Sequence, residues 1–208
     1  MAEVTMEMIK TLRERSGAGI MDCKAALAQT DGDMDKAMDI LRKKRADIAD
    51  KKAGRAAKNG LIHSYMHVRD LGGVPTVGVL VEVNCETDFA AKTPVIKKFA
   101  NDVCLHIAMA NPRWMSPSEV PADVIEKEKT IYREQLKESG KPDNIIEKIL
   151  EGRIKKFCEE NCLMDQVYAL AADKSEQKTI QAMLKETSGQ LGENMAIRRF
   201  VRFDVKGE

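Results

Sequence analysis

Aromatic residues are scarce in this 208-residue sequence. Only 4% of its residues are aromatic whereas 32% are charged, a composition typical of a soluble, helix-rich protein with a modest core. The five cysteines are odd in number and scattered, which favours free thiols in a reducing cytoplasm over a disulfide framework. No apolar run approaches the roughly 20 residues that span a bilayer, and the N-terminus lacks the pattern of a secretory signal. These absences predict a cytoplasmic protein without membrane contact.

Motifs that carry chemistry are also few. The net charge of +1 gives no general attraction to nucleic acid, and the absence of a Gly-x-x-x-x-Gly-Lys-Ser/Thr loop predicts that the chain does not bind a nucleotide itself. His63 and His67 share one face of a predicted strand, but two imidazoles alone do not make a zinc site. Cys158 and Cys162 have helical i,i+4 spacing and no obvious further ligands, which favours buried thiols. The sequence therefore predicts neither an enzyme nor a bound cofactor or metal.

The first part of the chain, residues 1–46, has the pattern of three short amphipathic helices. Apolar residues recur at three- and four-residue spacing, and Thr5 and Asp33 are suitable N-caps for the first and third helices. Gly17-Ala-Gly19 separates the first helix from the second. We therefore predict a three-helix bundle of the size of a binding module.

A basic stretch, residues 42–58, follows the third helix. It contains eight Lys or Arg against two Asp, and only Ile48 is strongly apolar. We interpret it as a solvated, partly helical linker, with the domain boundary set at 47–59. The alternative is a ribosome- or RNA-associated protein that uses this stretch for phosphate contacts.

Residues 60–208 are predicted to form an α+β core. Four valines alternate along one strand, residues 76–84, which pairs with residues 60–68 through a glycine-containing turn. A final strand near the C-terminus completes a three-stranded antiparallel sheet, which helices cover. These helices are expected at residues 94–110, 122–138, 143–163 and 175–189.

The most informative segment is residues 83–94, where a polar turn follows the strand that ends at Asn84. Thr93-Pro94 is a favourable start for the next helix, and the turn before it carries Phe89 beside Asp88. Residue chemistry alone leaves two arrangements open. Phe89 packs under a turn capped by Asp88, as buried Phe usually does, or it is exposed as an anchor for a partner.

Three stretches of the sequence resemble one family. Residues 84–90, NCETDFA, are similar to the Asn-Cys-x-Thr-Asp-Phe-Val signature of bacterial translation elongation factor Ts. Residues 12–27, LRERSGAGIMDCKAAL, and residues 191–200, LGENMAIRRF, resemble the N-terminal and C-terminal signatures of that family. The stretches lie in the family's order, and the likeness spans essentially the whole chain.

The resemblance implies a guanine-nucleotide exchange factor for elongation factor Tu, the GTPase that delivers aminoacyl-tRNA to the ribosome. It implies no covalent chemistry, no cofactor and no direct contact with nucleic acid. The contact that dislodges the partner's Mg²⁺ is carried over onto Thr87, Asp88, Phe89 and Ala90. A second partner contact, on the three-helix (UBA-like) module, is carried over onto Arg13, Ile20 and Met21. Short members of the family form homodimers through their sheets, so a homodimer is expected.

Several positions depart from the family pattern. Ala90 stands where Val is usual, which removes some packing beside Phe89, and Ser16 and Ile20 replace Thr and Met. Gln166-Val-Tyr-Ala169 replaces a Gln-Pro-Phe-Val motif. Because losing the proline frees the backbone there, no role is assigned to that segment.

Overall fold

Three N-terminal helices, α1 (Met6–Ser16), α2 (Ile20–Gln29) and α3 (Met34–Lys52), pack against one another around a small apolar core. The computed structural model describes residues 4–70, 72–137, 143–171 and 177–207. Thr5 caps α1 by accepting a hydrogen bond from the Met8 N–H, and Asp33 caps α3 by accepting from the N–H groups of Asp35 and Lys36. Both predicted N-caps are confirmed.

Helix α3 is longer than the sequence predicted. It continues through Lys52, so residues 47–52 of the expected linker are helical. Ala49, Lys51 and Lys52 are good helix formers, and Ala49 is buried, which gives the extension an apolar contact face. The proposed boundary between an N-terminal module and the core stays a prediction.

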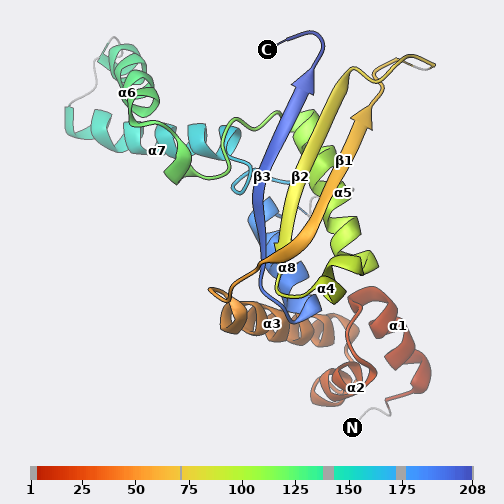
Figure 1. The fold of residues 1–208 in the computed structure, drawn as a ribbon. Helices are drawn as coiled ribbons and strands as arrows, with labels where there is room; N and C mark the ends of the chain where they lie inside the picture. The colour runs from red at the N-terminus through yellow and green to blue at the C-terminus, as the bar shows by residue number, and fades with distance from the viewer. Residues whose placement is uncertain (1–3, 71, 138–142, 172–176, 208) are drawn as a thin grey trace. The chain divides into compact units, whose positions relative to one another are not determined.

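Three strands, β1 (Asn59–His67), β2 (Val77–Cys85) and β3 (Met195–Asp204), form one antiparallel sheet in the order β1-β2-β3 (Figure 1). The sheet and the helices confirm the predicted α+β class. Side chains of β2 alternate between buried and more exposed positions, and its four valines are all buried. One face of the central strand therefore belongs to the core.

Helices account for most of the rest of the described chain. After β2 come the five-residue helix α4 (Asp88–Lys92) and α5 (Pro94–Ala110). A 3-10 turn (Pro117–Glu119) precedes α6 (Ala122–Lys137) and α7 (Asp143–Asn161), which pack as a pair. The last helix is α8 (Ile180–Leu191).

The prediction for α8 was wrong at both ends. Residues 175 and 176 lie outside the described residues, and residues 177–179 are not helical, because Thr179 pairs with Val167 in an isolated β-bridge. The helix ends at Leu191, and the next residue, Gly192, has a φ of +70°, the left-handed conformation that commonly terminates helices. Gly189, the predicted end, is instead an interior position: a Cβ there would lie 2.2 Å from the Arg45 carbonyl oxygen. Its glycine permits a close backbone approach to α3.

The chain divides into two compact units. The first contains residues 1–63, 81–100 and 182–198, and the second contains residues 64–80, 101–181 and 199–208. All of the residues that were assigned to partner contact from the sequence belong to the first unit.

Candidate functional site

The segment after β2 is a short helix rather than the polar turn expected from sequence. Thr87 is the N-cap of α4, and its hydroxyl accepts a hydrogen bond from the Ala90 N–H at 3.2 Å. Thr93 ends α4 and, as predicted, starts the next helix, where its Oγ1 accepts from the Ile96 N–H at 3.4 Å. Two threonine caps therefore enclose a single helical turn, which we call the α4 corner (residues 86–93).

The α4 corner presents its aromatic residue to solvent. Phe89 is 77% exposed, whereas the adjacent Ala90 is 6% exposed. Full burial of a Phe side chain stabilises a protein by about 1.5–3 kcal/mol, so this exposure forgoes a substantial gain in stability. Of the two arrangements left open by the sequence, the structure has the exposed one.

Charged side chains surround the exposed ring. Lys92 Nζ lies 2.6 Å from Asp88 Oδ2 and 5.7 Å from the centroid of the Phe89 ring. The hydrogen bond from Lys92 lowers the pKa of the Asp88 carboxyl below its ordinary value. The exposed surface of the corner is thus an aromatic face flanked by one acid and one base.

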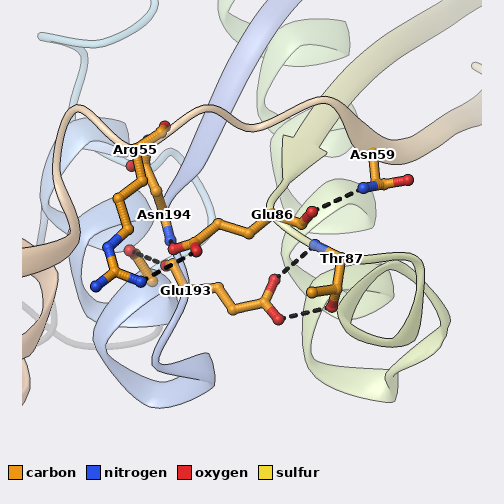
Figure 2. Close-up of polar contacts among 7 residues, drawn as sticks. Arg55, Asn59, Glu86, Thr87, Glu193 and Asn194 are labelled. Carbon is orange, nitrogen blue, oxygen red and sulfur yellow. Dashed lines mark hydrogen bonds and ion pairs between the residues drawn. The ribbon is translucent and has the colours of Figure 1, made fainter.

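A carboxylate from the far end of the chain holds the base of the α4 corner. Glu193 accepts hydrogen bonds from the Thr87 hydroxyl at 2.6 Å and from the Thr87 N–H at 3.1 Å (Figure 2). Glu193 follows directly after the left-handed Gly192 that ends α8. This residue was not predicted from the sequence, although it lies inside the third stretch that resembles the family.

A second carboxylate, Glu86, ties three segments together (Figure 2). Its side chain accepts from the Asn194 N–H at 2.7 Å and pairs with Arg55 at 3.4 Å. Its backbone oxygen accepts from the Asn59 side chain at 2.7 Å, and the Asn194 side chain donates to the Arg55 carbonyl at 2.6 Å. The Asn194 N–H and, to a lesser extent, Arg55 lower the pKa of the Glu86 carboxyl. These contacts hold the strand end, the segment before β1 and the start of β3 together.

The second predicted contact surface lies where α1 meets α2. Gly17 has a φ of +64°, which lets the chain reverse there. Ile20 and Met21, in the first turn of α2, are 49% and 74% exposed. With Arg13 they line an open groove that includes the glycine bend, which we call the bend groove (residues 10–22).

The bend is fixed from inside the molecule. The buried Ser16 hydroxyl accepts from the Ala18 N–H at 3.1 Å, so the serine that replaces the family's usual threonine still makes a hydrogen bond. The Arg45 guanidinium of α3 donates to the Ser16 carbonyl. Asp88, Phe89, Arg13, Ile20 and Met21 are therefore exposed side chains on a hydrogen-bonded backbone, whereas Thr87 is half-buried and Ala90 is buried.

Acidic side chains pair with part of the basic stretch at residues 42–58. Lys44 pairs with Asp22 at 2.6 Å, and Arg55 pairs with Glu86. Asp50 of the stretch pairs in turn with Lys185 of α8 at 2.7 Å. This pairing reduces the charge available to phosphates. The RNA-binding alternative stays a prediction that none of these contacts favours.

A buried polar cluster in the second unit was also not predicted. His106 is 1% exposed, and its Nε2 lies 2.8 Å from Oε1 of the buried Gln166. Its Nδ1 accepts from the Ala169 N–H at 3.2 Å, which assigns the ring proton to Nε2. Burial lowers the pKa of this histidine. The segment at 166–169 therefore has an internal structural partner.

Within the described ranges, no group of three or more His, Cys, Asp or Glu side chains could hold a metal ion. All five cysteines are buried, as expected for Cys158 and Cys162, and none of them forms a disulfide. Over those same residues, no helix is long and apolar enough to cross a membrane.

Comparisons with known proteins match nearly the whole chain. A family model described as "Elongation factor TS" matches residues 35–175. A protein from Fervidobacterium nodosum named elongation factor Ts is 51% identical over 203 residues, which are 98% of this chain and 98% of the relative. Proteins of the same name from Thermoanaerobacter sp. (strain X514) and Geobacter sulfurreducens are 50% and 51% identical over 205 residues, 99% of this chain and 96% and 90% of the relatives.

Proposed function

Because the chain belongs to the elongation factor Ts family, we propose that it is the guanine-nucleotide exchange factor for elongation factor Tu in translation elongation. The observation that carries this proposal is the α4 corner: an aromatic ring, Phe89, held in solvent by a capped and clamped helical turn. An exposed aromatic on a rigid support suits insertion into a partner's pocket, because such anchors contribute much of the energy of an interface.

Exchange by such a protein is a problem of linked equilibria. A GTPase holds GDP through its phosphate-binding loop and through a bound Mg²⁺ that offsets the phosphate charge. An exchange protein that binds best to the GTPase with a distorted nucleotide site weakens the binding of GDP. By linkage, GDP weakens the binding of the exchange protein to the same extent. The protein therefore accelerates GDP release without making or breaking a covalent bond.

We assign the residues of the α4 corner to this distortion. Phe89 is the wedge that enters the GTPase near its Mg²⁺ site and stabilises the Mg²⁺-free form. Asp88 is exposed next to it and is placed to engage polar groups released there. Thr87 and Ala90 are more buried, so we assign them to holding the corner rather than to the main contact.

The bend groove is proposed to supply affinity rather than distortion. Ile20 and Met21 offer exposed apolar area next to the Arg13 guanidinium. Flexible, polarizable methionine suits an adaptable contact surface. This surface would keep the partner bound while the α4 corner acts.

A homodimer is also proposed. In the second unit, Met66, Leu80 and Phe203 of the three strands are 60%, 43% and 69% exposed. Exposed apolar area of this kind marks interaction surfaces. Light scattering tests this proposal: the wild-type mass should be that of two chains and should fall to one in Met66→Lys or Phe203→Lys. A monomeric wild-type protein would refute it.

Release of fluorescent GDP tests the exchange function. Purified elongation factor Tu loaded with labelled GDP is mixed with excess unlabelled GDP, with and without this protein. We expect the protein to raise the release rate and to hydrolyse no GTP when it is alone. An unchanged release rate would overturn the proposal.

A further inference from the structure

Glu193 lies outside the residues assigned to partner contact, yet its carboxylate accepts two hydrogen bonds from the base of the α4 corner. We propose that Glu193 is a positioning residue for nucleotide exchange. Its carboxylate fixes Thr87 in the conformation that caps α4 and thereby presents Phe89 to the GTPase. The proposal rests on the exchange function inferred above and adds to it a residue that acts through another.

The two hydrogen bonds from Thr87 to the Glu193 carboxylate, which we call the clamp, fix both the backbone and the side chain of Thr87. One carboxylate oxygen of Glu193 accepts from the Thr87 hydroxyl at 2.6 Å and the other accepts from the Thr87 N–H at 3.1 Å (Figure 2). Hydrogen bonds to a charged acceptor are about twice as strong as those between neutral groups. Two such bonds to one residue leave it little freedom of rotation.

The hydroxyl of Thr87 transmits this constraint to α4. A hydroxyl has one proton to donate, and here the proton points to Glu193. The lone pairs of the oxygen are then directed elsewhere, and one accepts from the Ala90 N–H at 3.2 Å. That N–H belongs to the first turn of α4, where donors lack a partner within the helix. Glu193 therefore sets the orientation in which Thr87 caps the helix.

Capping is a large part of what holds so short a helix. Helix α4 has five residues, far fewer than the roughly 12–15 at which an isolated helix becomes even marginally stable. Phe89 is mostly exposed and adds little burial of its own. Loss of the clamp should therefore disturb where Phe89 points more than it disturbs the core.

Glu193 is itself held in place by α8. Its N–H donates to the Ser188 carbonyl at 3.3 Å, and the Ser188 hydroxyl donates to the Glu193 carbonyl at 2.5 Å. The left-handed Gly192 between them turns the chain out of the helix. The carboxylate therefore projects from a fixed backbone, as a positioning group requires.

Stopped-flow release of labelled GDP from elongation factor Tu, measured over a range of concentrations of this protein, tests the proposal. For Glu193→Ala we expect the maximal rate to fall about tenfold or more, a change of about 1.4 kcal/mol or more. The half-saturating concentration should change little, because the bend groove is intact. Glu193→Gln, which keeps one acceptor oxygen, should lie between Glu193→Ala and wild type.

Substitutions at Thr87 separate positioning from a general structural role. Thr87→Val removes the hydroxyl at nearly constant shape and should lower the maximal rate, whereas Thr87→Ser keeps the hydroxyl and should exchange faster than Thr87→Val. If the two residues act through one contact, Glu193→Ala combined with Thr87→Val should be no slower than the slower single variant. Glu159→Ala, which removes an exposed carboxylate on α7 that pairs with Lys155, is the matched control and should leave the rate unchanged.

The outcomes are distinguishable. If wild-type protein does not accelerate release, the exchange function fails. The positioning role is wrong, and the exchange function stands, if the wild type is active and Glu193→Ala has the same maximal rate as the wild type. The same conclusion follows if the effects of Glu193→Ala and Thr87→Val on the maximal rate multiply in the double variant. Should Glu193→Ala not fold in a circular dichroism melt, the Thr87 pair decides: equal rates for Thr87→Val and Thr87→Ser would overturn the proposal.

Discussion

The α4 corner and the bend groove present apolar side chains to solvent on differently built supports. The corner exposes one aromatic ring on a five-residue helix that a distant carboxylate clamps. The groove exposes Ile20 and Met21 at the start of a ten-residue helix, after a left-handed glycine. A single rigid ring suits the distortion of a partner, and an open groove with flexible side chains suits its retention. We therefore expect the corner to govern the maximal exchange rate and the groove to govern affinity.

The sharpest way to test this division is Phe89→Ala. We expect the maximal rate of GDP release to fall about thirtyfold, since losing an interface anchor costs about 2 kcal/mol or more. The free energy of unfolding should change by less than about 1 kcal/mol, because surface substitutions have small effects and the ring is 77% exposed.

Urea melts and stopped-flow release on the same sample measure both quantities for Phe89→Ala. Met109→Ala, which trims another exposed apolar side chain (57% exposed) on α5, is the control and should alter neither. A variant that loses several kcal/mol of stability yet exchanges at the wild-type rate when folded would identify Phe89 as a core residue.

Gly189→Ala tests whether the two surfaces are independent. Its added Cβ would meet the Arg45 carbonyl oxygen at 2.2 Å. Arg45 also donates to Ser16 at the bend, and α8 carries Glu193 to the corner. We expect a loss of about 2 kcal/mol in the free energy of unfolding, within the range for overpacked sites, and weaker function at both surfaces.

A second interior helix glycine provides the control for Gly189→Ala. A Cβ added at Gly152 of α7 would meet no atom within 4 Å, so Gly152→Ala should stabilise the protein by up to about 1 kcal/mol through helix propensity. Chemical denaturation compares the two variants. If both are stabilised, the close approach of α8 and α3 does not constrain position 189.

Met21→Ala probes the groove alone. We expect the half-saturating concentration for exchange to rise about fivefold, or about 1 kcal/mol, with the maximal rate unchanged. Met6→Ala provides a matched control, because Met6 is 75% exposed against 74% for Met21 but does not line the groove. A fall in the maximal rate without a change in affinity would contradict the division between the two surfaces.

Lowering the pH should affect the hydrogen bonds that support the α4 corner but not those that support the bend groove, and this effect should be smaller than those above. The pKa of Glu86 is lowered in the folded protein, chiefly by the Asn194 N–H, from an ordinary value of 4.5. A carboxyl whose pKa is lowered by folding stabilises the protein at pH values above its pKa in the unfolded state. This stabilisation is lost as the pH falls through its pKa in the folded state. The amide resonance of Asn194 should therefore titrate below pH 4.5.

The Ala18 amide, which donates to the Ser16 hydroxyl at the bend, is the internal reference for this titration. It should not move with pH over the same range, because a hydroxyl acceptor does not titrate there. In Glu86→Gln the Asn194 resonance should lose its pH dependence. A titration that persists in this variant would assign the effect to another carboxyl.

The local elements were predictable from sequence, and the long-range contacts were not. The N-caps Thr5, Asp33 and Thr93 were identified because a cap depends on residues within one turn. Helix α4 was missed because a single turn has no period to detect. Glu193 was missed because its partner Thr87 lies 106 residues away, and no spacing rule connects the two.

The extent of α3 and the end of α8 depart from the sequence prediction for a shared reason. The charged, alanine-rich stretch predicts a linker that is only partly helical, whereas α3 continues through Lys52, and Gly189 predicts a helix end that lies inside α8. Both positions lie where α3 and α8 approach each other, at Arg45 and at the ion pair between Lys185 and Asp50. Helix packing selected glycine at an interior position, where helix propensity alone would exclude it.

The lysine beside Phe89 has a consequence for the behaviour of the protein in a crowded cell. A bare aromatic surface invites self-association, and natural sequences limit this by placing charged gatekeeper residues next to unavoidable apolar ones. Lys92, 5.7 Å from the ring centroid, is such a gatekeeper, and it sits on a helical turn that offers no strand edge for pairing. A Lys92→Leu variant would enlarge the exposed apolar surface beside Phe89 and remove its neighbouring charge, so we expect this variant to self-associate more readily than the wild type.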